Sequence, residues 1–215
     1  MTPAHITALL TMVGLALLLL FGERPQSTRA RIIIKGPTSA LFIATAVLSG
    51  CLETSWGTLV LAGLVLSWLG DVLLIGQNRA AFLAGLVAFL LGHVAYGAAF
   101  VERGLDLAGG ALPTLGVALI PAALVGRWLL PKVDQKMKLA VLAYMVVITI
   151  MVALAGGTVA AHGRPLLLLG AIVFWLSDVS VATDRFAGGT FTNRVWGLSF
   201  YYGGQLLLAL SSGPN

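Results

Sequence analysis

Two aspartates, Asp71 and Asp178, stand inside long apolar segments, whereas the other six acidic residues fall in or beside polar connections. A carboxylate at the centre of a membrane helix costs about 2.5–3.5 kcal/mol to insert, so such a residue usually faces a bundle interior and serves a function. Two carboxylates in different environments can divide proton donation and proton acceptance between them. We therefore predict an acid–base pair at Asp71 and Asp178; the alternative is a structural hydrogen bond or ion pair at each.

Polar and aromatic side chains recur on the segments around the two aspartates. Gly63, Ser67, Gly70 and Asp71 follow helical spacing and share one face, where the small residues allow a neighbouring helix to approach closely. The other candidates also have ordinary explanations: a core histidine, interfacial tyrosines, a glutamine that joins helices, or a snorkelling lysine. We expect the residues that bind or orient a substrate to come from one set: Lys35, Ser67, His93, Tyr96, Tyr144, Ser177, Tyr201, Tyr202 and Gln205.

The sequence contains no pattern that is typical of a metal or cofactor site, and we expect neither. His5, His93 and His162 lie on different segments, and Cys51 is the only cysteine, which excludes a thiolate cluster or an intrachain disulfide. HExxH, GxSxG, Walker-type and GxGxxG motifs are also missing from the sequence.

The elements that must position these residues are membrane helices. Of the 215 residues, 59% are apolar and only 10% are charged, and the mean hydropathy is +0.98. A soluble domain carries about 25% charged residues, so a water-soluble globule is excluded. We predict an all-α, polytopic membrane bundle of eight transmembrane helices in one domain, residues 1–215. The apolar segments are 4–22, 37–52, 57–76, 80–101, 110–130, 138–156, 165–182 and 193–211, the second beginning at Gly36-Pro37 and the fifth kinked at Pro121.

The basic residues predict the orientation of the bundle. Eleven lie in or next to the connections that follow odd-numbered segments, and only Arg103 and Arg164 lie in the others. Short connections rich in Lys and Arg stay in the cytoplasm, so we expect both termini outside the inner cell membrane. The net charge of +5 therefore indicates topology, and we expect no nucleic-acid partner. The eleven are Arg24, Arg29, Arg31, Lys35, Arg79, Arg127, Lys132, Lys136, Lys138, Arg185 and Arg194.

The third and seventh segments share a short internal match. WLGDV at 68–72 and WLSDV at 175–179 differ at one position and lie 107 residues apart. Because four helices separate them, both segments run in the same direction, which favours two parallel four-helix repeats, about 1–105 and 106–215. Chance is the alternative explanation. Asp71 and Asp178 lie five and four residues before the ends of their predicted segments, roughly 8 and 6 Å inside the cytoplasmic boundary.

Four motifs, in order along the chain, resemble those of the YhhN-like membrane proteins, the lysoplasmalogenases. SWLGDVLL at 67–74 is similar to SxxGDxxL, and FLAGLVAFLLGHVAY at 82–96 is similar to FxxGxxxFxxxHxxY. GAIVFWLSD at 170–178, followed by Arg185-Phe186, resembles the second aspartate helix of the family, and YYGGQ at 201–205 resembles its final YYxxQ helix. One departure is Lys35-Gly36-Pro37, where the family has Lys-Pro.

The resemblance implies hydrolysis of the vinyl ether bond of lysoplasmalogens, which yields a fatty aldehyde and glycerophosphoethanolamine or glycerophosphocholine. Asp71 and Asp178 would then supply a proton donor, an anion for the oxocarbenium ion and a base for water, as paired carboxylates do in glycosidases. Lys35, with Arg79 or Arg185, would receive the phosphate. The partners implied are a lysophospholipid substrate and membrane lipid, and small residues on the outer helix faces permit a homo-oligomer.

Two alternatives remain open at this stage. A lipid or small-solute transporter would use the aspartates as a proton relay. Transporter sites cluster at the membrane midplane and often between inverted repeats, whereas this internal match is parallel and the aspartates are shallow. A non-catalytic scaffold would leave two intramembrane carboxylates unexplained.

Overall fold

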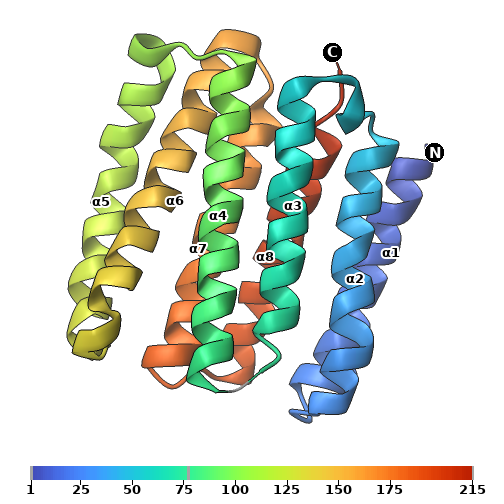
Figure 1. Ribbon diagram of the computed structural model, residues 1–215, viewed down its shortest axis with the longest axis vertical. Helices are drawn as coiled ribbons and strands as arrows, with labels where there is room; N and C mark the ends of the chain where they lie inside the picture. The colour runs from blue at the N-terminus through green and yellow to red at the C-terminus, as the bar shows by residue number, and fades with distance from the viewer. Residues whose placement is uncertain (1, 77, 215) are drawn as a thin grey trace.

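The computed structural model describes residues 2–76 and 78–214, and these residues form eight α-helices and no strand. Figure 1 shows the helices side by side in an up-and-down bundle. The prediction of an all-α fold is therefore confirmed. The helices are α1 Pro3–Leu17, α2 Thr28–Leu48, α3 Ser55–Leu73, α4 Arg79–Arg103, α5 Leu112–Leu129, α6 Gln135–His162, α7 Pro165–Phe186 and α8 Phe191–Leu210. A π-helical turn extends α1 through Leu18–Glu23, and another, Leu107–Ala111, leads into α5.

Seven of the described helices, α1 to α7, are long and apolar enough to cross a membrane. α8 is not among them, because Asn193, Arg194 and Gln205 make it more polar than the others. The protein is thus a multi-pass membrane bundle in which α8 is shielded by its neighbours. Its side chains Tyr202 and Gln205 are fully buried.

The connections divide between two ends of the bundle. The links α1–α2, α3–α4, α5–α6 and α7–α8 lie at one end, and both termini lie at the other end with the remaining links (Figure 1). We call the first of these the basic end, because the eleven basic residues named above flank its connections. Only Arg103 and Arg164 flank the connections at the opposite end.

The second helix begins nine residues earlier than the sequence predicts. Ser27 caps it, with its hydroxyl accepting a hydrogen bond from Ala30 N at 3.3 Å, and Pro37 lies inside the helix. The Gly36-Pro37 pair was expected to mark the start, since proline lacks an N–H and disfavours a helical residue before it. That expectation was wrong, because a membrane helix that packs on its neighbours tolerates an internal proline. The additional turns bring Arg31 and Lys35 into α2.

Helix packing places six helices around one centre. α3 packs on α4 and α7 packs on α8, while α2 contacts both α3 and α8, and α6 contacts both α4 and α7. α3 and α4 approach closely because Gly63 faces the Tyr96 ring and Gly70 faces the Phe89 ring. A Cβ atom at Gly70 would lie 2.6 Å from that phenyl ring. Ser67 and Asp71, on the same face of α3, are consequently buried in the bundle.

Candidate active site

Asp71 is a buried carboxylate with three donors around it. Lys35 Nζ lies 3.0 Å from Oδ1. The hydroxyls of Ser39 and Tyr201 both donate to Oδ2, at 2.6 Å each. A cation and two hydroxyl donors stabilise the ionised form of a carboxyl group. Asp71 is therefore arranged as an anion, held by side chains from α2 and α8.

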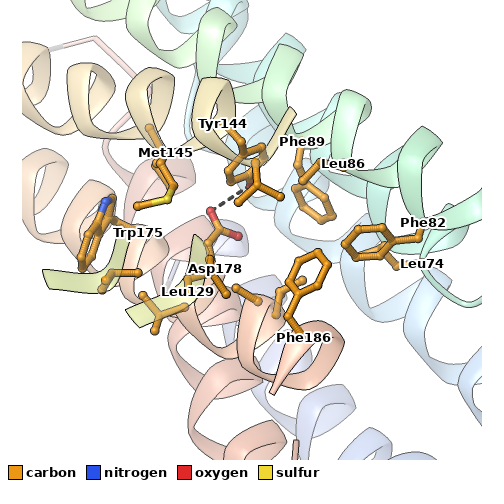
Figure 2. Close-up of a pocket in the computed structure, with 16 residues that line it drawn as sticks. Leu74, Phe82, Leu86, Phe89, Leu129, Tyr144, Met145, Trp175, Asp178 and Phe186 are labelled. Carbon is orange, nitrogen blue, oxygen red and sulfur yellow. Dashed lines mark hydrogen bonds between the residues drawn. The ribbon is translucent and has the colours of Figure 1, made fainter. Parts of the chain in front are cut away.

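Asp178 has a different environment, in which one hydroxyl among the described residues donates to it. Tyr144 Oη donates to Asp178 Oδ2 at 2.9 Å, and Figure 2 shows this contact beside apolar side chains. His93 Nε2 lies 3.5 Å from the same oxygen. His93 Nδ1 is 2.6 Å from the Phe89 carbonyl oxygen and so carries the hydrogen there. In the neutral form of the ring, Nε2 is then an acceptor that faces Asp178, and a protonated carboxyl group is complementary to it.

Both aspartates line one cavity of about 450 Å³ that opens at the basic end. This volume falls within the range of small-molecule sites. We call it the polar cavity, because charged side chains surround it. Asp71 lies two residues before the end of α3, whereas Asp178 lies eight residues before the end of α7. The predicted segments end five and four residues after these aspartates, so the helices end at other residues than the sequence indicates, yet one cavity is lined by both carboxyl groups. The polar cavity is lined by Glu23, Gln26, Arg31, Lys35, Asp71, Leu74, Ile75, Gly76, Phe82, Phe89, Ser177, Asp178, Ser180, Val181, Asp184, Arg185, Arg194, Gly197, Leu198 and Tyr201.

A second, smaller hollow of about 70 Å³ adjoins the first and is almost entirely apolar. We call it the apolar pocket; side chains of α4, α5, α6 and α7 form most of its wall, and Figure 2 shows Asp178 pointing into it. Asp178 is the single charged side chain among the described residues that line it. Five residues line both spaces, so the polar cavity and the apolar pocket meet at Asp178: Leu74, Phe82, Phe89, Asp178 and Val181.

Three of the residues expected to orient a substrate line neither space and, among the described residues, form no hydrogen bond with either aspartate. Tyr96 Oη donates to Gln205 Oε1 at 2.6 Å, and both side chains are fully buried, as is Ser67. Ser177 does line the polar cavity, but its hydroxyl donates to Phe174 O at 2.7 Å.

The remaining expected residues gather around the two carboxylates. Lys35 and Tyr201 contact Asp71, and His93 and Tyr144 contact Asp178. The Tyr202 hydroxyl lies 2.9 Å from Ser39 Oγ, and Ser39 in turn donates to Asp71. Tyr202 and His93 are not among the residues that line either space.

Sequence reasoning missed Ser39, Arg31 and Arg194. Ser39 lies four residues after Lys35, and that spacing on one helix would have revealed it, had the helix been extended before Pro37.

The two arginines expected to receive the phosphate differ in their position relative to the polar cavity. Arg185 lines the polar cavity and stacks over the Phe82 ring at 4.4 Å, whereas Arg79 does not line it.

No group of three or more histidine, cysteine or acidic side chains that could hold a metal ion occurs among the described residues.

Comparison with known proteins identifies the family. The profile of the YhhN family matches residues 30–212, which is most of the chain. The chain belongs to the YhhN family. Among the relatives of this YhhN protein, a Bos taurus protein named lysoplasmalogenase TMEM86A is 33% identical over 178 residues, covering 80% of this chain and 72% of the relative. The Homo sapiens protein of the same name is 33% identical over 186 residues, with the same coverage. No solved structure matches the chain.

Proposed function

We propose that this YhhN protein is a lysoplasmalogenase, which hydrolyses the vinyl ether bond of lysoplasmalogens to a fatty aldehyde and glycerophosphoethanolamine or glycerophosphocholine. The names of its bovine and human relatives support this activity. The observation that carries the proposal is the position of Asp178, where the polar cavity meets the apolar pocket. A lipid with one chain has its ether bond at the same kind of boundary, between a polar headgroup and an apolar tail.

In the proposed mechanism Asp178 is the acid and Asp71 is the base. Protonated Asp178 transfers its proton to the β-carbon of the vinyl ether, and its carboxylate then stabilises the oxocarbenium ion. Water adds to the α-carbon and gives a proton to Asp71. The hemiacetal then collapses: its hydroxyl proton returns to Asp178, and the proton on Asp71 goes to the departing glycerol oxygen. Both carboxyl groups thereby regain their starting states.

The contacts of the two carboxyl groups support this assignment. Asp71 has Lys35, Ser39 and Tyr201 as donors, which favours the anion that a base requires. Among the described residues, Asp178 has Tyr144 as its one hydroxyl donor, and it faces Nε2 of His93, which accepts a proton in the neutral ring; this environment suits a protonated carboxyl group. The substrate chain would lie in the apolar pocket, and its headgroup would lie toward the basic end.

The membrane orientation follows the charge distribution. We propose that α8 is an eighth span, that the protein lies in the inner cell membrane, and that the basic end faces the cytoplasm, because its connections carry most of the lysine and arginine. Both termini would then lie outside.

We also propose that residues 1–215 form one domain of two parallel repeats. The packing of α2 on α8 corresponds to that of α6 on α4, as the repeat predicts. The pairs α1–α2 and α5–α6, and likewise α3–α4 and α7–α8, correspond in the same way.

The proposed activity is tested with purified protein in detergent and a 1-alkenyl lysophosphatidylethanolamine. Released aldehyde is measured by a coupled dehydrogenase, and the 1-acyl and 1-alkyl analogues serve as controls. We expect aldehyde from the vinyl ether alone. Absence of aldehyde, together with lipid or solute flux across vesicles that contain the protein, would contradict the proposal and favour a carrier.

A further inference from the structure

The polar cavity is lined by three arginines that have no role in the proposed proton transfers. Four cationic side chains line the cavity: Arg31, Lys35, Arg185 and Arg194. Lys35 is committed to Asp71, with Nζ and Oδ1 3.0 Å apart. The three guanidinium groups, from α2, α7 and α8, have no part in the proposed proton transfers.

Arg31 and Arg194 are held beside each other by a shared carboxylate. Arg31 Nη2 lies 2.8 Å from Glu23 Oε2, and Arg194 Nη1 lies 3.8 Å from the same oxygen. On its other side, Arg194 Nε donates to Asp184 Oδ2 at 2.8 Å. Two guanidinium groups from different helices are thereby fixed at the wall of one cavity. Fixed donors of this kind bind a phosphate with little loss of side-chain freedom.

Arg31 also has donor capacity that the protein does not use. Its Nε atom is buried and has no hydrogen-bond partner among the described residues. A buried N–H without an acceptor is unfavourable unless a ligand or water fills the position. Arg31 therefore has a side-chain N–H that no described residue satisfies, and the residue itself lies in the cavity wall.

The register of α2 places Arg31 where a headgroup would lie. Arg31, Lys35 and Ser39 follow at intervals of four residues and so share one face of the helix. Arg31 lies one turn, roughly 6 Å, closer to the basic end than Lys35 and its partner Asp71. In a lysophospholipid the glycerol unit lies between the ether bond and the phosphate. A substrate with its ether bond beside the two aspartates would therefore have its phosphate closer to the basic end, near Arg31.

The charged side chains that line the cavity leave one positive charge for a ligand to balance. Glu23, Asp71 and Asp184 oppose three of the four cations that line it. With Asp178 protonated, as the proposed mechanism requires, one positive charge remains. A phosphodiester carries one negative charge and would neutralise it.

We propose that Arg31 and Arg194 bind the phosphate of the lysophospholipid headgroup, with Arg185 supplying the balancing positive charge. This inference rests on the proposed function, because that function supplies the lipid. It adds a phosphodiester site at the mouth of the polar cavity, distinct from the carboxylates where the bond is cleaved.

The test measures binding and needs no turnover. The probes are 1-O-alkyl-glycero-3-phosphoethanolamine and 1-O-alkylglycerol, which lack the vinyl group and differ in the phosphate headgroup. Wild type, Arg31→Gln, Arg194→Gln and the control Arg29→Gln are compared in detergent. Arg29 lies in the same helix as Arg31 but is exposed and outside the cavity lining.

We expect wild type and Arg29→Gln to bind the phospholipid probe about tenfold more tightly than the alcohol, as loss of a charged hydrogen bond implies. Arg31→Gln and Arg194→Gln should lose that preference and bind the alcohol as before. If either glutamine variant binds both probes more weakly, Arg31→Lys and Arg194→Lys are measured next, because lysine keeps the charge beside Glu23. A loss of affinity for the phospholipid probe alone supports the site, and an equal loss for both probes overturns it.

An unchanged preference in both glutamine variants would also overturn the site. Failure of the proposed function gives a different result, since wild type would then release no aldehyde from the alkenyl lipid whatever its binding preference.

Discussion

Lys35 and Asp71 form an ion pair inside the bundle, with Nζ and Oδ1 3.0 Å apart. Their side chains are only 12% and 3% exposed. The pair joins α2 to α3, and Ser39, one turn beyond Lys35, donates to the other carboxylate oxygen. The central part of the bundle therefore depends on a charge balance as well as on apolar packing.

Loss of the cation should destabilise the fold. In Lys35→Met the Asp71 carboxylate would remain buried without its counterion, and breaking a buried pair in this way costs about 3–5 kcal/mol. The double variant Lys35→Met/Asp71→Asn removes both charges and should recover much of the lost stability. Thermal unfolding in detergent measures both effects. A double variant no more stable than Lys35→Met would show that the pair is not what stabilises this region.

The two aspartates should be separately essential for aldehyde release. Asp178→Asn removes the proposed proton donor and Asp71→Asn removes the proposed base, and we expect each to lower kcat by about 100-fold or more. Asp134→Asn is the matched control, because Asp134 is exposed at the basic end and its side chain forms no cap hydrogen bond. Turnover in either active-site variant close to that of the control would contradict the assigned roles.

His93 should affect the chemical step rather than the binding of substrate. His93→Phe removes the nitrogen that faces Asp178 but preserves a ring against Phe174, whose centroid is 4.5 Å away. We expect kcat to fall by about 100-fold with little change in KM, since a group that assists proton transfer contributes about that much. His93→Gln, which keeps a polar group, should retain more activity. A rise in KM at constant kcat would indicate instead that His93 affects the binding of substrate and not the proton transfer.

The sequence alone reveals the two aspartates because an intramembrane carboxylate is rare and must have a reason. The apolar segments likewise predict the number and order of the helices. Helical spacing also assigns Ser67 and Asp71 to one face of α3, and both are buried. It does not tell which part of a buried face lines a cavity: Ser67, Tyr96 and Gln205 are expected to orient a substrate, yet none of them is among the residues that line the polar cavity, and Tyr96 donates to Gln205.

Other residues escaped prediction for reasons that are physical. The Gly36-Pro37 pair hid the first turns of α2, and with them the alignment of Arg31, Lys35 and Ser39. Arg194 was assigned to membrane topology, because every cation near a helix end satisfies that explanation equally well. Only the contacts to Glu23 and Asp184 distinguish it from basic residues such as Arg29, which is exposed. Such contacts join segments that are distant in sequence.

The apolar pocket should set the preference for chain length. Ala182 lies on α7 one turn beyond Asp178 and lines this pocket together with Phe82, Phe186 and Met145. Ala182→Phe would fill part of a space of about 70 Å³ with a phenyl ring. We expect kcat/KM for a long-chain alkenyl substrate to fall by about tenfold or more, as for the loss of one to three buried methylenes. A short-chain substrate, whose tail ends before the ring, should be cleaved nearly as well as by wild type.

Thr183→Phe, at the next position of α7 and outside the pocket lining, provides the control. Equal losses for both chain lengths in Ala182→Phe would mean that the chain lies elsewhere, because a steric block inside its binding site must discriminate by length.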